Sequence, residues 1–207
     1  QNRAGVYQAG ELPAHGDTIY LTTADRHGYM VSLIQSNYAG MGGGIVPKDV
    51  GFMLQNRGAA FSLQPGHRNA LEPGKRPFHT IIPAFVTKNG KPYFSYGVMG
   101  GSMQPQGHVQ VLMNMVDFGM GPQEAGDAPR IRHEGSSTPE GLPAEGVGTM
   151  MLEAGFSPVV VRDLVKMRHQ VGSGLYFGGY QGILWNEEEG YYIGATESRV
   201  DGASVGF

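Results

Sequence analysis

The sequence predicts an α+β fold in which antiparallel sheets are covered by helices. Segments rich in β-branched and aromatic residues return on themselves across short turns, both early and late in the chain. Between these segments, apolar residues recur at helical spacing. Glycine makes up 34 of 207 residues and clusters between apolar segments without a collagen period, which is typical of tight turns in a strand-rich protein. This order of strands, helices and strands favours the α+β class.

The predicted strands begin after a polar segment at residues 1–16, which has no clear period and is expected to be mobile. Residues 18–24 and 29–36 predict a hairpin, because two β-rich runs flank an Asp-Arg-His-Gly turn. Residues 81–87 and 92–97 predict a second hairpin, joined by an Asn-Gly pair that favours positive φ. A further strand is predicted at residues 51–54.

The predicted helices lie in the second half of the chain. Apolar residues at helical spacing predict an amphipathic helix over residues 105–118. A second helix is predicted over residues 157–168, with Ser157 as N-cap and Pro158 at its first position. Residues 181–194 predict another strand, turn and strand. No internal repeat or linker divides the chain.

Composition excludes several classes of function. The formal net charge of −3 argues against nucleic acid as the main partner, which usually requires a basic face. The absence of cysteine excludes disulfides and a thiol nucleophile. The seven histidines show no metal-ligand spacing, so no metal site is expected, and His108 and His133 are interpreted as surface or helix-packing residues. No apolar stretch is long enough to predict a membrane span.

The beginning of the chain suggests a piece of a longer precursor. It starts with Gln1 rather than Met, and its first 17 residues contain no apolar core of a signal peptide. We therefore expect an upstream portion that would carry any export signal. The compartment is left open, with the cytoplasm as the first expectation and the periplasm or the exterior as the alternative.

The candidate nucleophile is Thr18, at the mouth of the first predicted strand. A threonine hydroxyl needs an adjacent base, and an N-terminal threonine can use its own α-amine for this purpose. The alternative is that Thr18 is an ordinary strand residue.

The wider sequence resembles the small subunit of the γ-glutamyltransferases. The resemblance covers nearly all of residues 18–207, in order and at suitable spacing. The matching segments are residues 17–28, 31–33, 42–47, 54–57, 73–77, 100–102, 128–130 and 194–199.

The resemblance implies an N-terminal-nucleophile hydrolase fold, a four-layer αββα sandwich. It also implies a precursor that cuts itself between Asp17 and Thr18. Residues 1–17 would then end the upstream large subunit, and residues 18–207 would be the catalytic small-subunit region. The upstream segment is the expected partner, in a heterodimer or a dimer of heterodimers. No metal or organic cofactor is implied.

The resemblance also implies roles for further residues. Gly100 and Gly101 match the pair whose N–H groups form the family's oxyanion hole, and they precede a predicted helix, where free amides favour negative charge. The alternative is a strand-to-helix turn that requires glycine, and both readings can hold together. Ser36 matches a hydroxyl residue that orients the nucleophile's amine; alternatively, it is a strand residue that faces solvent.

Departures from the family pattern concern the substrate. Ala60 stands where transpeptidases carry an acidic residue that holds the α-amino group of the γ-glutamyl moiety. His79 and Thr80 replace a serine pair that binds the substrate carboxylate. Arg57 could grip a carboxylate with its planar fork, or it could be a structural ion-pair partner.

These features predict an enzyme that hydrolyses γ-glutamyl amides such as glutathione, with water favoured over an amino acid as acceptor. One alternative is a cephalosporin or glutaryl side-chain acylase with the same catalytic residues. The other is a catalytically silent relative.

Overall fold

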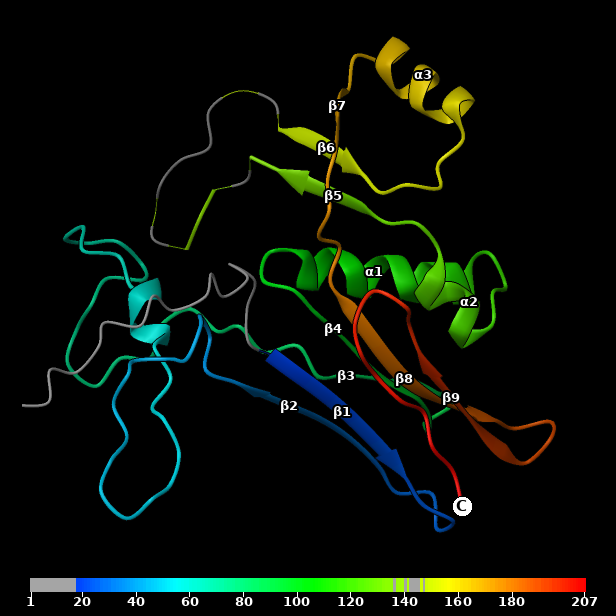
Figure 1. Cartoon of the computed structure of the whole chain (residues 1–207), viewed down its shortest axis with the longest axis horizontal. Helices are drawn as coiled ribbons and strands as arrows, with labels where there is room; N and C mark the ends of the chain where they lie inside the picture. Colours follow the sequence, from blue (N-terminus) through cyan, green and yellow to red (C-terminus); the bar gives the residue numbers. More distant parts are fainter. Residues whose placement is uncertain (1–17, 136, 140, 142–145, 147) are drawn as a thin grey trace, which may run out of the picture.

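The computed structural model describes residues 18–207, except residues 136, 140, 142–145 and 147. These described residues form three sheets with helices beside them, so the chain mixes helices and sheets as predicted (Figure 1). The strands are β1 (Thr18–Ala24), β2 (Met30–Ser36), β3 (Ala84–Lys88), β4 (Lys91–Met99), β5 (Ile131–Glu134), β6 (Thr149–Leu152), β7 (Gln170–Ser173), β8 (Gly179–Asn186) and β9 (Tyr191–Thr196). The helices are η1 (Arg57–Ala60), α1 (Met103–Val116), α2 (Pro122–Asp127) and α3 (Pro158–Lys166).

The first predicted hairpin is confirmed as the two-stranded sheet β1–β2. Its antiparallel register places Thr18 opposite Ser36. At the turn, one carboxylate oxygen of Asp25 accepts hydrogen bonds from the N–H groups of His27 and Tyr29, at 2.8 and 3.0 Å. Such a side chain favours a turn because it satisfies the backbone locally.

The second predicted hairpin, β3–β4, belongs to a four-stranded antiparallel sheet in the order β3-β4-β8-β9. Asn89 and Gly90 have φ angles of 54° and 76°, so the Asn-Gly turn is confirmed. The ladder starts at Ala84 rather than at residue 81, because Pro83 has no N–H to donate. The predicted strands of residues 181–194 are confirmed as β8 and β9.

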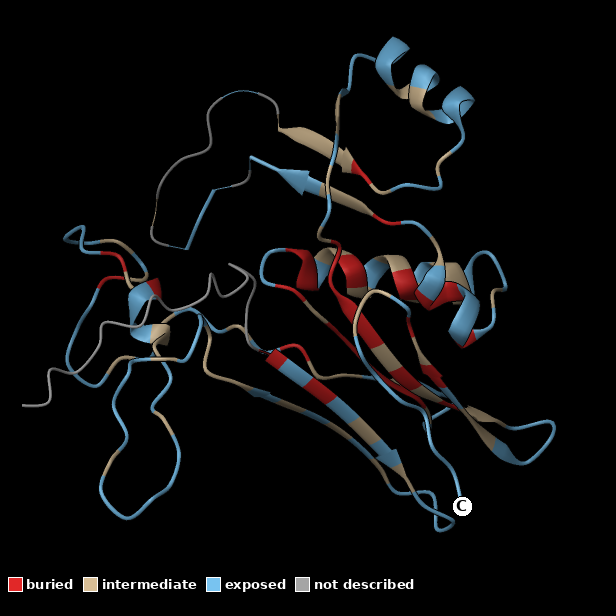
Figure 2. Cartoon of the chain, viewed as in Figure 1, coloured by how far each residue is buried: buried red, intermediate tan, exposed pale blue. Residues whose placement is uncertain are grey.

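The hydrophobic core lies between this sheet and the helices α1 and α2, which cover one of its faces (Figures 1 and 2). Phe94, Val98 and Tyr180 from the sheet pack with Val111 of α1, and all four are fully buried. Helix α1 approaches closely because Gly107 has no side chain: a Cβ there would lie 2.6 Å from Cγ1 of Val98.

The hairpin β1–β2 packs on the opposite face of the four-stranded sheet, which gives a helix–sheet–sheet arrangement (Figure 1). The ring of Tyr20 lies on the backbone of Gly97 in β4, where a Cβ would come within 2.8 Å of three ring atoms. Hydroxyl groups complete the contact between the sheets: Thr22 and Ser95 form a hydrogen bond of 2.7 Å. The start of β1 is therefore held at a fixed distance from β4.

A third sheet, β5-β6-β7, lies beyond α1 together with α3 (Figure 1). The hydroxyl of Ser157 accepts a hydrogen bond from the N–H of Val160 at 3.3 Å, so the predicted N-cap of α3 is confirmed. The first helix begins at Met103, and both helices end two residues before their predicted ends. No residue of α3 is buried in this chain, which Figure 2 shows as exposed and half-buried surface.

One predicted strand is wrong. Residues 51–54 form a loop, in which Leu54 exchanges backbone hydrogen bonds with Gly43 and Ile45 instead of joining a sheet. The predicted mobile segment at residues 1–16 lies outside the described residues, as does Asp17. In the described part of the chain, no helix is long and apolar enough to cross a membrane.

A buried charge network joins two of the segments that carry the resemblance. Arg130 and Glu197 form an ion pair with almost no solvent exposure. Arg199 donates hydrogen bonds to Glu197 at 2.7 Å and to Glu153 at 2.6 Å. Because each buried charge has an opposite charge beside it, the network fastens the segment after β9 to α2 and β6.

Replacing Gly97 by alanine tests the contact between the sheets. The added methyl group overlaps the ring of Tyr20, so we expect the variant to be less stable by about 1 to 3 kcal/mol. Urea denaturation measures the difference. Gly206→Ala is the control, since a Cβ there meets nothing within 4 Å. Equal denaturation midpoints for the two variants would contradict the close contact.

Candidate active site

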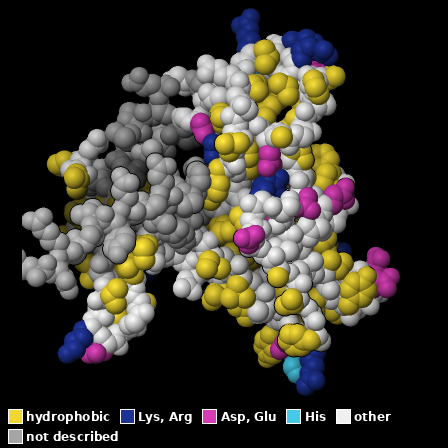
Figure 3. Space-filling view, in the orientation of Figure 1, with side chains coloured by type: hydrophobic (Ala, Val, Ile, Leu, Met, Phe, Trp, Pro, Cys, Tyr) yellow, Lys and Arg dark blue, Asp and Glu magenta, His cyan; other side chains and the backbone are white. Residues whose placement is uncertain are grey.

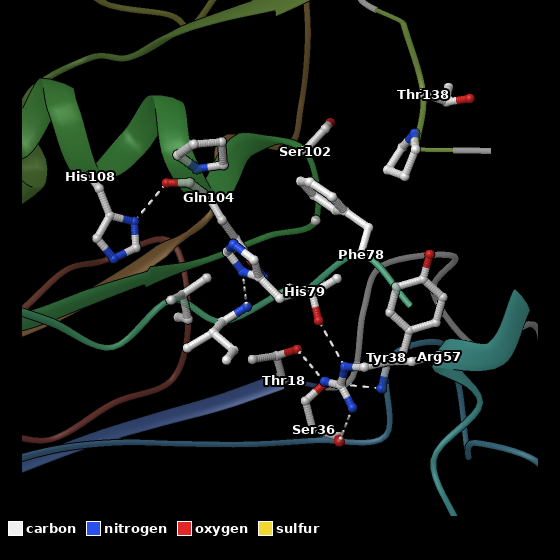
Figure 4. A pocket seen from close by; sticks show the side chains of 16 residues that line it. Thr18, Ser36, Tyr38, Arg57, Phe78, His79, Ser102, Gln104, His108 and Thr138 are labelled. Atoms are coloured by element: carbon white, nitrogen blue, oxygen red, sulfur yellow. Dashed lines mark hydrogen bonds between the residues drawn. The ribbon is translucent and has the colours of Figure 1, made fainter. Parts of the chain in front are cut away.

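A cavity of about 590 Å³ opens beside the start of β1. Its wall comes from β1, β2, η1, the loop before β3, the first turns of α1, and Thr138 and Pro139 after β5 (Figure 4). Most residues that were predicted for the site line this cavity, namely Thr18, Ser36, Arg57, His79, Thr80 and Gly101. Gly100 is the direct neighbour of Gly101 but is not part of the lining.

Thr18 is held at the edge of the cavity by its strand partner. It is 9% exposed, and its hydroxyl donates to Oγ of Ser36 at 2.9 Å. The N–H of Tyr38 donates to the same Ser36 oxygen, also at 2.9 Å. Ser36 is therefore half-buried and turned toward Thr18, and it does not face solvent.

The glycine pair forms the turn between β4 and α1. The carbonyl groups of Gly100 and Gly101 accept hydrogen bonds from the N–H groups of Met103 and Gln104, at 3.0 and 3.1 Å. Within the described part of the chain, the N–H groups of the two glycines donate no hydrogen bond. They are available to a group that carries negative charge.

The backbone also requires glycine at this turn. Gly100 has a φ of 136°, and a Cβ there would lie 2.8 Å from Cα of Gly178. The structural interpretation of Gly100 is thus confirmed, and it leaves the amide free for a second role.

Arg57 is fixed by contacts from three parts of the chain. Its Nε donates to Oγ1 of Thr80 at 2.7 Å, and its Nη1 donates to the carbonyl oxygen of Ser36 at 3.2 Å. The guanidinium carbon lies 5.8 Å from the ring centroid of Tyr38. Among the described residues Arg57 forms no ion pair, so this part of the chain holds no structural ion-pair partner for it.

The rest of the wall is mainly apolar. The rings of Phe78 and His79 are stacked at a centroid distance of 5.3 Å. The N–H of Ile81 donates to Nδ1 of His79 at 3.4 Å. Among the described residues that line the cavity, none is Asp or Glu. Ala60 is 2% exposed at the end of η1 and is not part of the lining.

His108 also lines the cavity, which the sequence did not predict. Its Nδ1 donates to the carbonyl oxygen of Gln104 at 2.6 Å, and its Nε2 accepts from the N–H of Val98 at 3.3 Å. Burial lowers the pKa of His108, so its imidazole is neutral near pH 7. With both nitrogens engaged, it packs α1 on β4 as predicted, while His133 is exposed on β5.

No group of three or more metal-binding side chains occurs among the described residues.

Comparisons with known proteins agree on one family. The sequence profile described as Gamma-glutamyltranspeptidase matches residues 2–207. A glutathione hydrolase-like proenzyme of Bacillus subtilis is 40% identical, in an alignment that covers 96% of this chain and 37% of the relative. The oxamate amidohydrolase proenzyme of Klebsiella pneumoniae is 37% identical, over 99% of this chain and 38% of the relative. The chain therefore spans little more than a third of these relatives.

Solved structures are similar over most of the chain. A cephalosporin acylase from Bacillus halodurans has a TM-score of 0.77 and 46% identity, over 89% of this chain and 33% of that one. The T380A mutant of Helicobacter pylori γ-glutamyltranspeptidase has a TM-score of 0.74 and 28% identity, over 87% of this chain and 99% of that one. These likenesses confirm the predicted N-terminal-nucleophile hydrolase fold.

Acidification tests the neutral state of His108. Its pKa is lowered in the folded chain, so below about pH 6.5 the unfolded chain binds a proton that the folded chain does not. Stability should therefore fall as the pH drops below this value, by up to about 1.4 kcal/mol per pH unit from this residue.

Urea denaturation at pH 7.5 and at pH 5.5 measures this effect. His108→Gln keeps an acceptor for Val98 but does not titrate, so its stability should depend less on pH. His169→Gln, at an exposed position, should behave like the parent. If all three proteins lose the same stability, His108 does not carry the effect.

Proposed function

The chain belongs to the γ-glutamyltranspeptidase family, and on this premise we propose that it is the catalytic C-terminal part of an autoprocessing threonine amidohydrolase. Residues 1–17 end the upstream subunit in this proposal, and residues 18–207 form the catalytic region. The names of its relatives support it, since they are called proenzymes. The single observation that carries it is the position of Thr18, whose hydroxyl lines the same cavity as the glycine turn.

In the proposed mechanism, cleavage between Asp17 and Thr18 frees the α-amine of Thr18. This amine takes the proton of the Thr18 hydroxyl, whose oxygen attacks the substrate carbonyl. The N–H groups of Gly100 and Gly101 stabilise the oxyanion. The ammonium returns the proton to the leaving amine as the amide bond breaks. Water then attacks the acyl-enzyme and releases the acid, which restores the hydroxyl.

The geometry around Thr18 supports this assignment. Its hydroxyl already points to a partner, Ser36, whose Oγ also holds the N–H of Tyr38. We assign Ser36 the role of orienting the nucleophile and its amine. The N–H groups of the glycine turn support their proposed role as an oxyanion hole, because they are not engaged elsewhere in the described chain.

The proposed substrates are γ-glutamyl amides such as glutathione, with hydrolysis favoured over transfer. Arg57, His79 and Thr80 form the part of the wall that would bind the acyl group. Arg57 keeps donors for a carboxylate beyond those used on Thr80 and Ser36. Because no carboxylate lines the described part of the cavity, the α-ammonium of a γ-glutamyl group finds no ion-pair partner there, and the proposal takes water as the acceptor.

The same observation favours a second candidate, a side-chain acylase for glutaryl or cephalosporin amides. A glutaryl group carries the carboxylate of a γ-glutamyl group but lacks its ammonium. The described cavity offers a guanidinium and apolar walls, and no acidic side chain. The likeness to a cephalosporin acylase points in the same direction.

The outer face of the β1–β2 hairpin supports the proposed upstream partner. Its apolar side chains are exposed, namely Ile19 (67%), Leu21 (45%), Val31 (50%) and Leu33 (46%). Figure 3 shows hydrophobic side chains on the surface in the lower part of the molecule, where the hairpin lies, and around α3. An αββα sandwich covers both faces of each sheet. We therefore assign the upstream segment to this face, in a heterodimer or a dimer of heterodimers.

Intact mass of the full-length precursor tests the processing step. We expect the purified parent to give two fragments that divide before Thr18. Thr18→Ala should remain uncut, because the hydroxyl that attacks the preceding bond is gone. Thr23→Ala, at an exposed position of β1, should be cut like the parent. A folded parent that stays as one chain would remove the mechanism and favour a silent relative.

Substrate profiling distinguishes the two candidates. Anilides with γ-glutamyl and glutaryl groups differ only by the α-ammonium. The leading proposal expects faster release from the γ-glutamyl anilide, with no acceleration by an added dipeptide acceptor. Faster release from the glutaryl anilide would assign the enzyme to the acylases, and strong acceleration by the acceptor would show a transferase.

A further inference from the structure

A fixed positive charge lies next to the candidate nucleophile. Thr18 and Ser36 are directly paired across the β1–β2 hairpin. Nη1 of Arg57 donates to the carbonyl oxygen of that same Ser36 at 3.2 Å. Figure 4 shows the guanidinium beside both residues, at the floor of the cavity. Paired antiparallel residues are about 5 Å apart, and the guanidinium lies one hydrogen bond beyond the carbonyl of Ser36, so its distance from the backbone nitrogen of Thr18 is on the order of 5 to 10 Å.

The charge of Arg57 is held in place. Thr80 fixes Nε at 2.7 Å, and the ring of Tyr38 lies under the guanidinium carbon at 5.8 Å. These contacts come from β2, the loop after it, and the segment before β3, so the side chain is tied on several sides. A positioned charge acts on its neighbours without a cost of rearrangement during the reaction.

The neighbouring titratable groups do not neutralise this charge. Among the described residues, the cavity has Tyr38, His79 and His108 beside Arg57, and no carboxylate. Burial lowers the pKa of His108, which keeps it neutral. Behind Thr18, burial raises the pKa of Tyr20 on β1 and raises that of Tyr96 on β4 to about 12, so both phenols are neutral.

We propose that Arg57 is a positioning residue whose charge shifts the α-amine of Thr18 toward its unprotonated form near neutral pH. The proposal rests on the proposed function, since only a cleaved chain has this amine. The amine must be unprotonated to take the hydroxyl proton, and a like charge nearby disfavours the ammonium form.

The size of the effect matters for activity. An ordinary α-amine has a pKa of about 8, so only about a tenth of the molecules would be active at pH 7. A neighbouring charge at this distance is expected to shift the titration by about one pH unit. About half of the molecules would then carry the free amine at pH 7, a gain of about fivefold.

The charge and the shape of the Arg57 side chain can be separated by two substitutions. Arg57→Met removes both, while Arg57→Lys keeps the charge but loses the planar fork. The pH dependence of kcat/KM reports the titration of the free enzyme, and its acidic limb follows the amine. Measurements use the processed enzyme with γ-glutamyl p-nitroanilide. Arg68→Met is the matched control, since Arg68 is exposed and does not line the cavity.

We expect Arg57→Met to move the acidic limb to higher pH by about one unit. Arg57→Lys should leave the limb near that of the parent, even though its KM rises. Arg68→Met should match the parent in both quantities. If the limb of Arg57→Met coincides with that of the parent while KM rises, Arg57 serves substrate binding alone and the proposal is overturned. A limb of Arg57→Lys that moves as far as that of Arg57→Met also overturns it.

Two controls keep this result separate from the proposed function. A variant that does not cut itself is assembled from two separately encoded subunits, with an initiator Met before Thr18 that the host's aminopeptidase removes. If the parent itself neither cuts nor turns over substrate, the proposed function has failed. When the parent is active, the difference between its acidic limb and that of Arg57→Met tests the role of Arg57 and not the proposed function.

Discussion

The site depends on the close stacking of the β1–β2 hairpin against β4. Tyr20 packs on Gly97, a contact that only a residue without a side chain permits. Tyr20 is two residues after Thr18, and Gly97 is three residues before Gly100. One contact between the sheets therefore sets the distance between the strand of the candidate nucleophile and the glycine turn. The hydrogen bond between Thr22 and Ser95 beside it allows the two sheets to meet through polar groups as well as rings.

The chemistry of the cavity follows from the residues that line it. Burial keeps His108 neutral. Its two ring nitrogens are both engaged by backbone partners, so it serves as a clamp between α1 and β4 and not as a competing base. The described wall holds the guanidinium of Arg57 without a carboxylate beside it. A cavity of this kind favours anionic groups and disfavours ammonium groups, whether they belong to a substrate or to the enzyme's own amine. In the proposed function, substrate choice and nucleophile activation are thereby linked through Arg57.

The sequence predicted those features whose signals are local. The turns at Asp25 and at Asn89-Gly90 have their own chemistry, and Ser157 caps α3 by the expected bond. The four-residue strands β5, β6 and β7 were missed, and so was α2, because such short runs carry no period and pair with distant segments. The predicted strand at residues 51–54 is wrong because this segment is a loop, in which Leu54 bonds to other loop residues and not to a sheet.

The candidate site residues were predicted from the family's motifs, but the contacts among them could be seen only in the structure. Arg57, Thr80 and Ser36 meet from segments that are far apart in the chain.

The central claim is that Thr18 forms the covalent acyl-enzyme. Rapid quenching during turnover of a slow amide substrate, followed by peptide mass spectrometry, tests it most directly. We expect the mass of the acyl group on the peptide that begins with Thr18. An acyl group on any other residue, under conditions where substrate turns over, would contradict the account.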